Sequence, residues 1–91
     1  MRVDQYLKKC RIIKQRSLAK RACDEGIVFI DGVRAKAGRR VLPGQRIRLE
    51  FVNRTLEIEV VDIPEGSVSK TEARDFYRVL RDERKSWDWP A

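Results

Sequence analysis

The sequence predicts an α+β protein in which a two-helix hairpin packs on a small, mainly antiparallel sheet, with one more helix near the C-terminus. Three observations lead to this prediction. Apolar residues recur at helical spacing up to residue 26, alternate with charged residues from residue 46 to residue 60, and return to helical spacing after residue 69. A chain of 91 residues has room for one small domain with an appendage, but not for a large catalytic domain as well.

The first two predicted helices are short. Apolar residues recur at i, i+4 and i+7 from Val3 to Cys10, which predicts a helix over residues 2–10. After a linker, Ser17 is a favourable N-cap for a second helix, because its hydroxyl can accept from backbone N–H groups one turn on. Gly26 suits the left-handed position that follows the end of that helix.

Strand signals occupy the middle of the chain. The apolar run 28–30 precedes Asp31-Gly32, a dipeptide that favours a type I′ turn, so the chain is expected to return over residues 33–37. After the Pro43-Gly44 turn, two segments alternate apolar and charged residues. They predict half-buried strands over 47–51 and 56–60.

The last regular element is predicted to be helical. Ser69 and Glu72 match a capping box, and apolar residues follow at i, i+3, i+4 and i+7 from Ala73 to Leu80. This pattern predicts an amphipathic helix over residues 70–84, followed by a tail that carries two tryptophans, Trp87 and Trp89.

Positive charge is concentrated in the N-terminal half. Residues 1–48 hold 14 basic and 4 acidic groups, whereas residues 49–91 hold 7 and 10, for a net charge of +7. Such concentration on one module is typical of a protein that binds a polyanion. The first half lacks the broad apolar helix face that a membrane-surface segment needs, so nucleic acid is the favoured partner.

Several functional classes are excluded or disfavoured. The chain has no histidine, which excludes histidine-based catalysis and histidine metal ligation. We predict no catalytic residue, no cofactor and no metal site. Cys10 and Cys23 form no Cys-x-x-Cys motif and are expected to be small buried apolar residues, with a disulfide between them as the alternative. No secretory signal or bilayer-spanning run is present, which favours a cytoplasmic protein without a membrane partner.

The order and spacing of these motifs resemble the alpha-L RNA-binding family, which is named after small-subunit ribosomal protein four. The likeness spans about half of the chain. Gln45 departs from it, since the family usually has Asp after the glycine of that turn. The matching residues are Arg2-Val3-Asp4-x-Tyr6-Leu7, Arg11, Arg16-Ser17-x-Ala19, Gly26-x-Val28-x-Ile30-Asp31-Gly32-x-x-x-Lys36 and Val41-x-Pro43-Gly44-x-x-Ile47.

Within that family the chain is similar to the small ribosome-quality-control members, the RqcP group, and to the fifteen-kilodalton heat-shock ribosome-recycling protein. The first likeness implies binding to stalled large ribosomal subunits that carry peptidyl-tRNA in the P site, with contacts to large-subunit rRNA and tRNA. It also implies support of C-terminal alanine tailing by RqcH. The expected division is an RNA-binding domain over 1–66 and a C-terminal helix with its tail over 67–91.

Basic residues of the hairpin and the following loop are the candidate RNA ligands. Their alternative is a solvated basic surface without a ligand. Asp4 is expected to be a structural partner of an RNA-binding arginine such as Arg16, because a lone Asp is poor evidence for catalysis. The candidates are Arg2, Arg11, Lys14, Arg16, Lys20, Arg34, Lys36, Arg39 and Arg40.

Aromatic residues are expected to serve the core rather than to stack on bases. Phe29, Phe51, Phe76 and Tyr77 are assigned to the core, because they do not alternate with basic residues as a stacking platform requires. Two other functions stay open: a nucleic-acid-modifying enzyme, and an adaptor that acts through its last helix and tryptophan tail.

Overall fold

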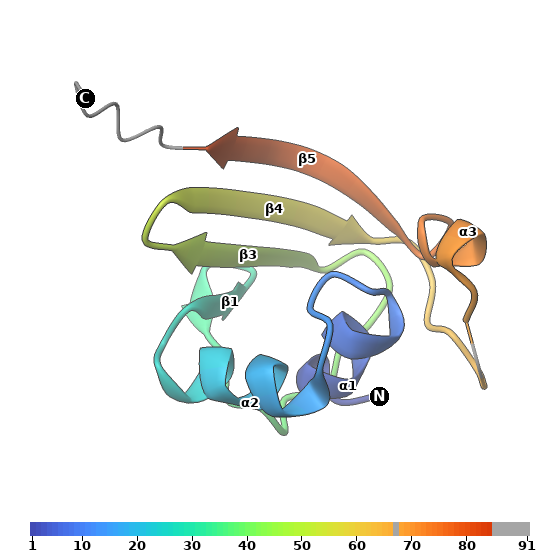
Figure 1. Ribbon diagram of the computed structural model, residues 1–91, viewed down its shortest axis with the longest axis horizontal. Coiled ribbons are helices and arrows are strands. Elements are labelled where there is room, and N and C mark those ends of the chain that lie inside the picture. The colour runs from blue at the N-terminus through green and yellow to red at the C-terminus, as the bar shows by residue number, and fades with distance from the viewer. Residues whose placement is uncertain (67, 85–91) are drawn as a thin grey trace.

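A helical hairpin lies against one end of a five-stranded antiparallel sheet in the computed structural model, which describes residues 1–66 and 68–84 (Figure 1). The predicted α+β fold class is therefore confirmed. The helices are α1 (Val3–Lys9), α2 (Arg16–Asp24) and α3 (Lys70–Ala73). The strands are β1 (Val28–Ile30), β2 (Val33–Arg34), β3 (Arg46–Phe51), β4 (Arg54–Val60) and β5 (Tyr77–Arg84).

The strands lie in the order β2-β1-β3-β4-β5, and every neighbouring pair is antiparallel. Asp31 and Gly32 join β1 to β2 with positive φ values of 50° and 82°, as a type I′ turn requires. The Asp31 carboxylate also accepts a hydrogen bond of 3.0 Å from the N–H of Arg46 at the start of β3. The turn thus helps to hold β3 in register beside β1.

The hydrophobic core lies between the hairpin and one face of the sheet. Alternation along β3 and β4 buries every second side chain, as the sequence pattern predicted. The buried face of α2 carries the small residues Ala19 and Ala22. The main core residues are Val3, Tyr6, Leu7, Ala19, Ala22, Val28, Ile30, Ile47, Leu49, Ile58 and Val60.

Both hairpin helices end in the same hydrogen-bonding pattern. The N–H two positions past each C-cap donates to the carbonyl five residues earlier, at 3.0 Å for α1 and 2.9 Å for α2. This Schellman motif needs a left-handed residue one position earlier. In α2 that residue is Gly26, as predicted, with φ 77°. In α1 it is Arg11, with φ 58°, although this conformation costs a side-chain-bearing residue about 1 kcal/mol.

The predicted C-terminal helix over residues 70–84 is wrong beyond its first turn. Ser69 caps α3 as expected, accepting from the N–H of Glu72 at 3.2 Å, but the helix ends at Ala73. Residues 77–84 instead form β5, which pairs with β4 along its whole length through a bulge. The free edge of β4 offers a full row of backbone donors and acceptors, and this tertiary pairing outweighs the local helical spacing.

The start of α2 and the end of β2 also differ from the prediction. The N-cap of α2 is Gln15, whose carbonyl accepts from the N–H of Ala19 at 3.1 Å, so Ser17 lies inside the helix. The strand expected over residues 33–37 ends at residue 34. The chain leaves the sheet there because it next pairs with the N-terminus, where the carbonyl of Arg39 accepts from the N–H of Val3 at 2.7 Å.

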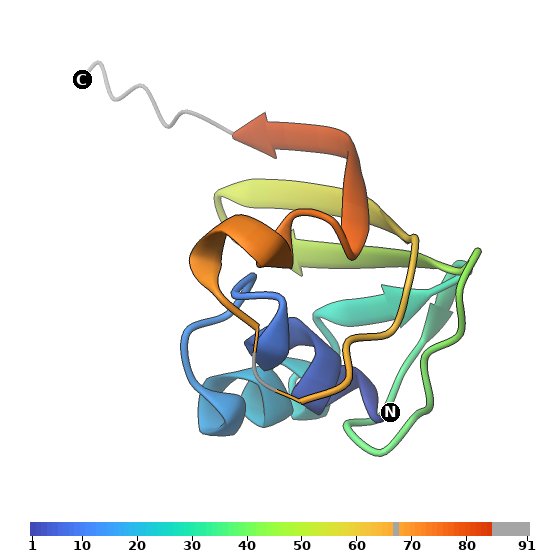
Figure 2. The same ribbon diagram turned by 90° about the vertical axis from the view of Figure 1, so that its right-hand side faces the viewer.

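The chain after β4 runs down beside α1 before it returns to the sheet as β5 (Figure 2). The hydroxyl of Tyr6 on α1 donates a 2.6 Å hydrogen bond to the carbonyl of Phe76, directly before β5. The division of the chain at residue 66 stays a prediction, although β4 and β5 share one sheet. Trp87 and Trp89 lie outside the described residues.

Both cysteines are buried free thiols, as the sequence favoured over a disulfide. Cys10 is 1% exposed and Cys23 is 5% exposed. Burial raises the pKa of each thiol to about 11, because the thiolate loses its hydration.

We therefore expect both thiols to resist alkylation in the folded protein. A rise of the thiol pKa from 9.0 to about 11 lowers the thiolate population roughly 75-fold at pH 8.5, before any effect of access. Iodoacetamide labelling followed by mass spectrometry should show slow reaction in buffer and rapid double labelling in urea. Rapid labelling in buffer would contradict this burial.

Candidate nucleic-acid interface

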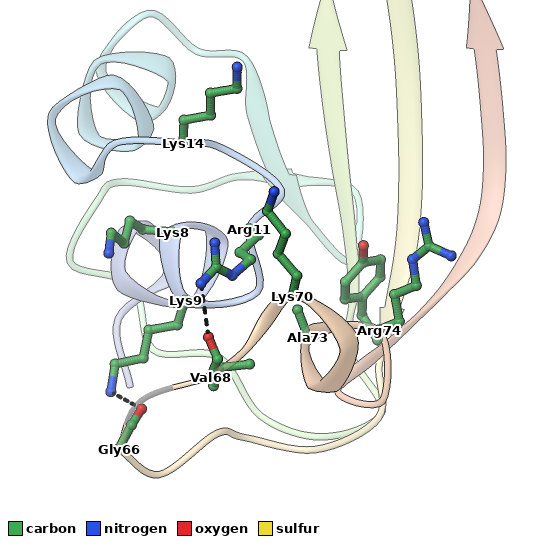
Figure 3. A pocket seen from close by; sticks show the side chains of 10 residues that line it. Lys8, Lys9, Arg11, Lys14, Gly66, Val68, Lys70, Ala73 and Arg74 are labelled. Carbon is green, nitrogen blue, oxygen red and sulfur yellow. Dashed lines mark hydrogen bonds between the residues drawn. The ribbon is translucent and has the colours of Figure 1, made fainter.

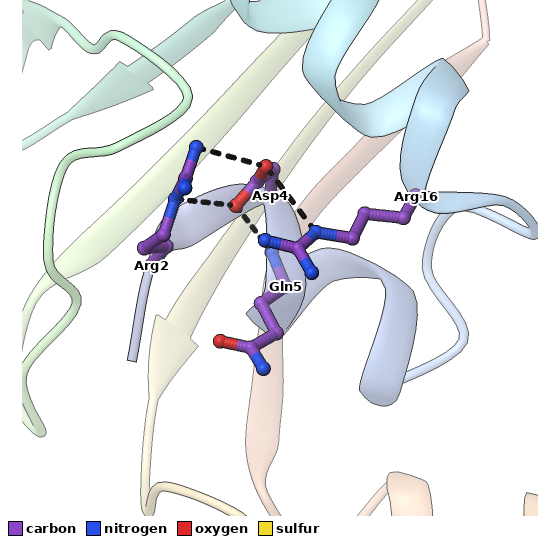
Figure 4. A network of polar contacts seen from close by, with 4 residues as sticks. All are labelled: Arg2, Asp4, Gln5 and Arg16. Carbon is purple, nitrogen blue, oxygen red and sulfur yellow. Dashed lines mark hydrogen bonds and ion pairs between the residues drawn. The ribbon is translucent and has the colours of Figure 1, made fainter.

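A single buried carboxylate holds two arginines at the surface of the hairpin (Figure 4). Asp4 lies in the first turn of α1 and accepts a 2.8 Å hydrogen bond from the N–H of Gln5. Its two oxygens lie 3.4 Å from Nε of Arg2 and 3.6 Å from Nε of Arg16. The Asp4 side chain is 2% exposed, whereas those of Arg2 and Arg16 are 47% and 52% exposed.

This geometry places two positive groups in fixed positions while leaving much of each guanidinium open to solvent. An arginine offers five N–H donors, so contact with Asp4 leaves donors for a phosphate. The cluster holds two cations and one anion and stays net positive. Because the carboxylate restrains both side chains before binding, less side-chain entropy is lost when a ligand arrives.

Backbone pairing brings a distant basic segment next to this pair. Arg2 and Arg40 form an isolated antiparallel bridge, and the N–H of Val41 donates to the carbonyl of Met1 at 2.9 Å. Arg39 and Lys36 belong to the same segment and are exposed. Segments nearly 40 positions apart thus contribute arginines to one surface.

The other candidate residues fall in three places. Lys20 is exposed on α2, one turn after Arg16. Arg11 and Lys14, in the linker between the helices, line a cleft between α1 and α3 (Figure 3). Arg34 lies on the edge strand β2, with its guanidinium beside Gly26 after the end of α2.

Phe29 is not part of the helix–sheet core, which corrects its assignment. It alternates with buried Val28 and Ile30 and so points to the opposite face of the sheet. The guanidinium carbons of Arg48 and Arg34 lie 4.5 Å and 5.7 Å from its ring centroid. The other three assigned aromatics, Phe51, Phe76 and Tyr77, are partly buried against the core.

Sequence reasoning missed three lysines that line the same cleft as Arg11: Lys8, Lys9 and Lys70. Lys8 and Lys9 carried a usable signal, because they end α1 within three positions of Arg11. Lys70 carried none, since nothing in the sequence places the start of the last predicted helix opposite the end of α1.

The described residues contain no group of three or more potential metal ligands. Within the same part of the chain, no helix is long and apolar enough to cross a membrane. The arrangement is suited to binding anions through fixed guanidinium and ammonium groups.

The chain is similar to known proteins over most of its length. Residues 1–47 match the family model of the S4 domain, and this range contains the whole Asp4 cluster. The chain is 36% identical to the "RQC P-site tRNA stabilizing factor" of Bacillus subtilis, over 92% of this chain and 96% of that protein. The Halalkalibacterium halodurans protein of the same name is 37% identical, over 91% of this chain and 93% of its own.

The chain belongs to the S4-domain family, in the group of these factors. The trimeric structure of Vibrio cholerae Heat Shock Protein 15 is also similar, with a TM-score of 0.80 and 31% identity. The structural match covers 88% of this chain and 81% of the Heat Shock Protein 15 chain. S4 domains bind RNA, and the surface around Asp4 lies within the S4 match.

We expect the two arginines beside Asp4 to be coupled. Arg2→Ala or Arg16→Ala alone leaves the carboxylate one partner, so each should lower the free energy of unfolding by at most about 1 kcal/mol. The double variant leaves a buried carboxylate without a cation, and its loss should exceed the two single losses together by about 0.5–3 kcal/mol. Urea unfolding of all four proteins measures the difference, and strict additivity would contradict the shared carboxylate.

Two substitutions of Arg11 should differ in their effect on stability but not in their effect on RNA binding. Arg11→Gly and Arg11→Ala both remove the guanidinium, but only glycine is free of strain at φ 58°. We expect the glycine variant to be about 1 kcal/mol more stable than the alanine variant in urea unfolding. RNA affinity should be equally reduced in both. Equal stabilities would mean that the left-handed conformation carries no cost here.

Proposed function

We propose that this protein is a non-enzymatic RNA-binding factor of ribosome quality control. On this proposal it acts on stalled large ribosomal subunits that carry peptidyl-tRNA and stabilises the tRNA in the P site. The observation that carries the proposal is the Asp4-held pair of arginines within the S4 match. The chain also aligns over most of its length with factors named for stabilising P-site tRNA, which supports it.

The proposed mechanism is electrostatic and positional. Arg2 and Arg16 meet backbone phosphates of folded RNA and release the counterions condensed there. Contacts to phosphates do not distinguish one base from another, so recognition depends on the shape of the RNA. Arg39, Arg40, Lys36 and Lys20 extend the same contact on either side of the pair.

The resemblance extends the proposal to partners and to location. The protein then contacts large-subunit rRNA and peptidyl-tRNA in the cytoplasm, and it supports the alanine tailing that RqcH performs. Its contribution is to hold the tRNA in place, which needs no catalytic group in this chain.

Arg16→Ala should weaken binding to purified large subunits that carry peptidyl-tRNA by about five- to tenfold near 0.1 M salt, the loss of about one phosphate contact. Co-sedimentation measures the affinity. Arg21→Ala is the matched control, because Arg21 is also an exposed, ion-paired arginine of α2. Equal loss in both variants, or none in Arg16→Ala, would contradict the proposed interface.

A second candidate is a general ribosome-recycling factor, as the resemblance to the heat-shock member of the family implies, and the similar fold of Heat Shock Protein 15 supports it. Co-sedimentation with large subunits that lack tRNA separates the two. Stabilisation of P-site tRNA requires clearly weaker binding to the empty subunits, whereas equal binding would favour the second candidate.

A further inference from the structure

A cleft of about 880 Å³ separates the hairpin from α3 and is rich in positive charge (Figure 3). Among the residues that the structure describes, no acidic side chain lines it. Ala73 and Tyr77 contribute to its wall. We call it the α1–α3 cleft, and its six cations are Lys8, Lys9, Arg11, Lys14, Lys70 and Arg74.

Two of these cations fasten the wall of the cleft. Nζ of Lys9 donates to the carbonyl of Gly66 at 2.9 Å, and a guanidinium nitrogen of Arg11 donates to the carbonyl of Val68 at 3.3 Å. Both bonds join the end of α1 to the chain that leads into α3. Arg11 donates this hydrogen bond while its backbone is in the left-handed conformation, which is strained for a residue with a side chain.

The other four cations, Lys8, Lys14, Lys70 and Arg74, form no ion pair within the described ranges. Arginines on the sheet provide the contrast. Arg48 pairs with Glu50 on β3, and on β5 Arg78 and Arg81 pair with Glu59 and Glu83. Like charges gathered without counter-charges repel one another, and an anionic ligand would relieve that repulsion.

We propose that the α1–α3 cleft holds a stretch of the phosphodiester backbone of RNA, in addition to the contact at the Asp4-held pair. This inference rests on the proposed function, and it extends the RNA-binding surface beyond the S4 match at residues 1–47 to Lys70 and Arg74. The cleft is far larger than a single phosphate, with space for roughly thirty water molecules. It can therefore accommodate several linked phosphates.

The test neutralises the two cleft cations that lie outside the S4 match. Lys70→Gln with Arg74→Gln should weaken binding to large subunits carrying peptidyl-tRNA by about tenfold or more near 0.1 M salt. The slope of log affinity against log salt should become shallower by about 1–2, because up to two phosphates are no longer neutralised. Arg78→Gln with Arg81→Gln is the matched control, with the same change in charge on β5 outside the cleft, and thermal melting checks the fold of both variants.

Three outcomes would overturn the cleft proposal: unchanged affinity of the cleft variant, an equal loss in the control, or an unchanged salt slope. Because Arg16→Ala tests the Asp4-held pair separately, loss there with full binding by the cleft variant would reject the cleft and leave the proposed function standing. Failure of the unmodified protein to bind the subunits would reject the proposed function itself.

Amine footprinting distinguishes RNA from an acidic protein as the occupant. Acetylation of Lys14 and Lys70 should fall when large subunits bind. In a separate experiment, deproteinised large-subunit RNA and tRNA should lower it as well. Protection by intact subunits alone would assign the cleft to an acidic protein surface and overturn the proposal.

Discussion

The buried carboxylate of Asp4 is the constraint around which the basic surface is built. A carboxylate that is almost fully removed from water needs charge partners and hydrogen bonds, and Asp4 finds them in two arginines and the first turn of α1. Arg2 precedes α1 and Arg16 begins α2, so this contact fixes the start of one helix against the start of the other. Bridging of Arg2 to Arg40 adds a third segment to the same point.

Charge is organised differently on the two sides of the molecule. On the sheet, arginines pair with glutamates of the same or the neighbouring strand, which gives a solvated and nearly balanced surface. On the hairpin and around the α1–α3 cleft, basic residues outnumber acidic ones. The buried acid of the hairpin, Asp4, pairs with Arg2 and Arg16 and holds them at the surface. The net charge of the chain does not show this division. The division is nevertheless what makes one side of the molecule suited to bind a polyanion.

The segment after β4 links the sheet to the hairpin. It contacts α1 through Tyr6 and Lys9 and the linker after α1 through Arg11, and then returns to the sheet as β5. This path places α3 opposite the end of α1 and so creates the cleft. Residues outside the S4 match therefore shape the surface that the hairpin presents.

Much of the fold could be predicted from local patterns. The stripe of α1, the alternation of β3 and β4, the Asp31-Gly32 turn and the glycine after α2 each depend on spacing or on backbone preference, which neighbouring residues determine. The pairing of Asp4 with arginine was also accessible, because the three residues lie in a short hairpin. The concentration of charge in the first half is enough by itself to indicate a polyanion partner.

Other features depend on partners that are distant in the chain, and local patterns do not contain them. The helical spacing that begins at Ala73 runs on to Leu80, but the open edge of β4 provides the backbone hydrogen bonds that make residues 77–84 a strand. The cleft likewise depends on residues more than 50 positions apart meeting at the end of α1. Sequence spacing records which residues share an element, whereas contacts between elements are decided by the burial and hydrogen bonding of the whole fold.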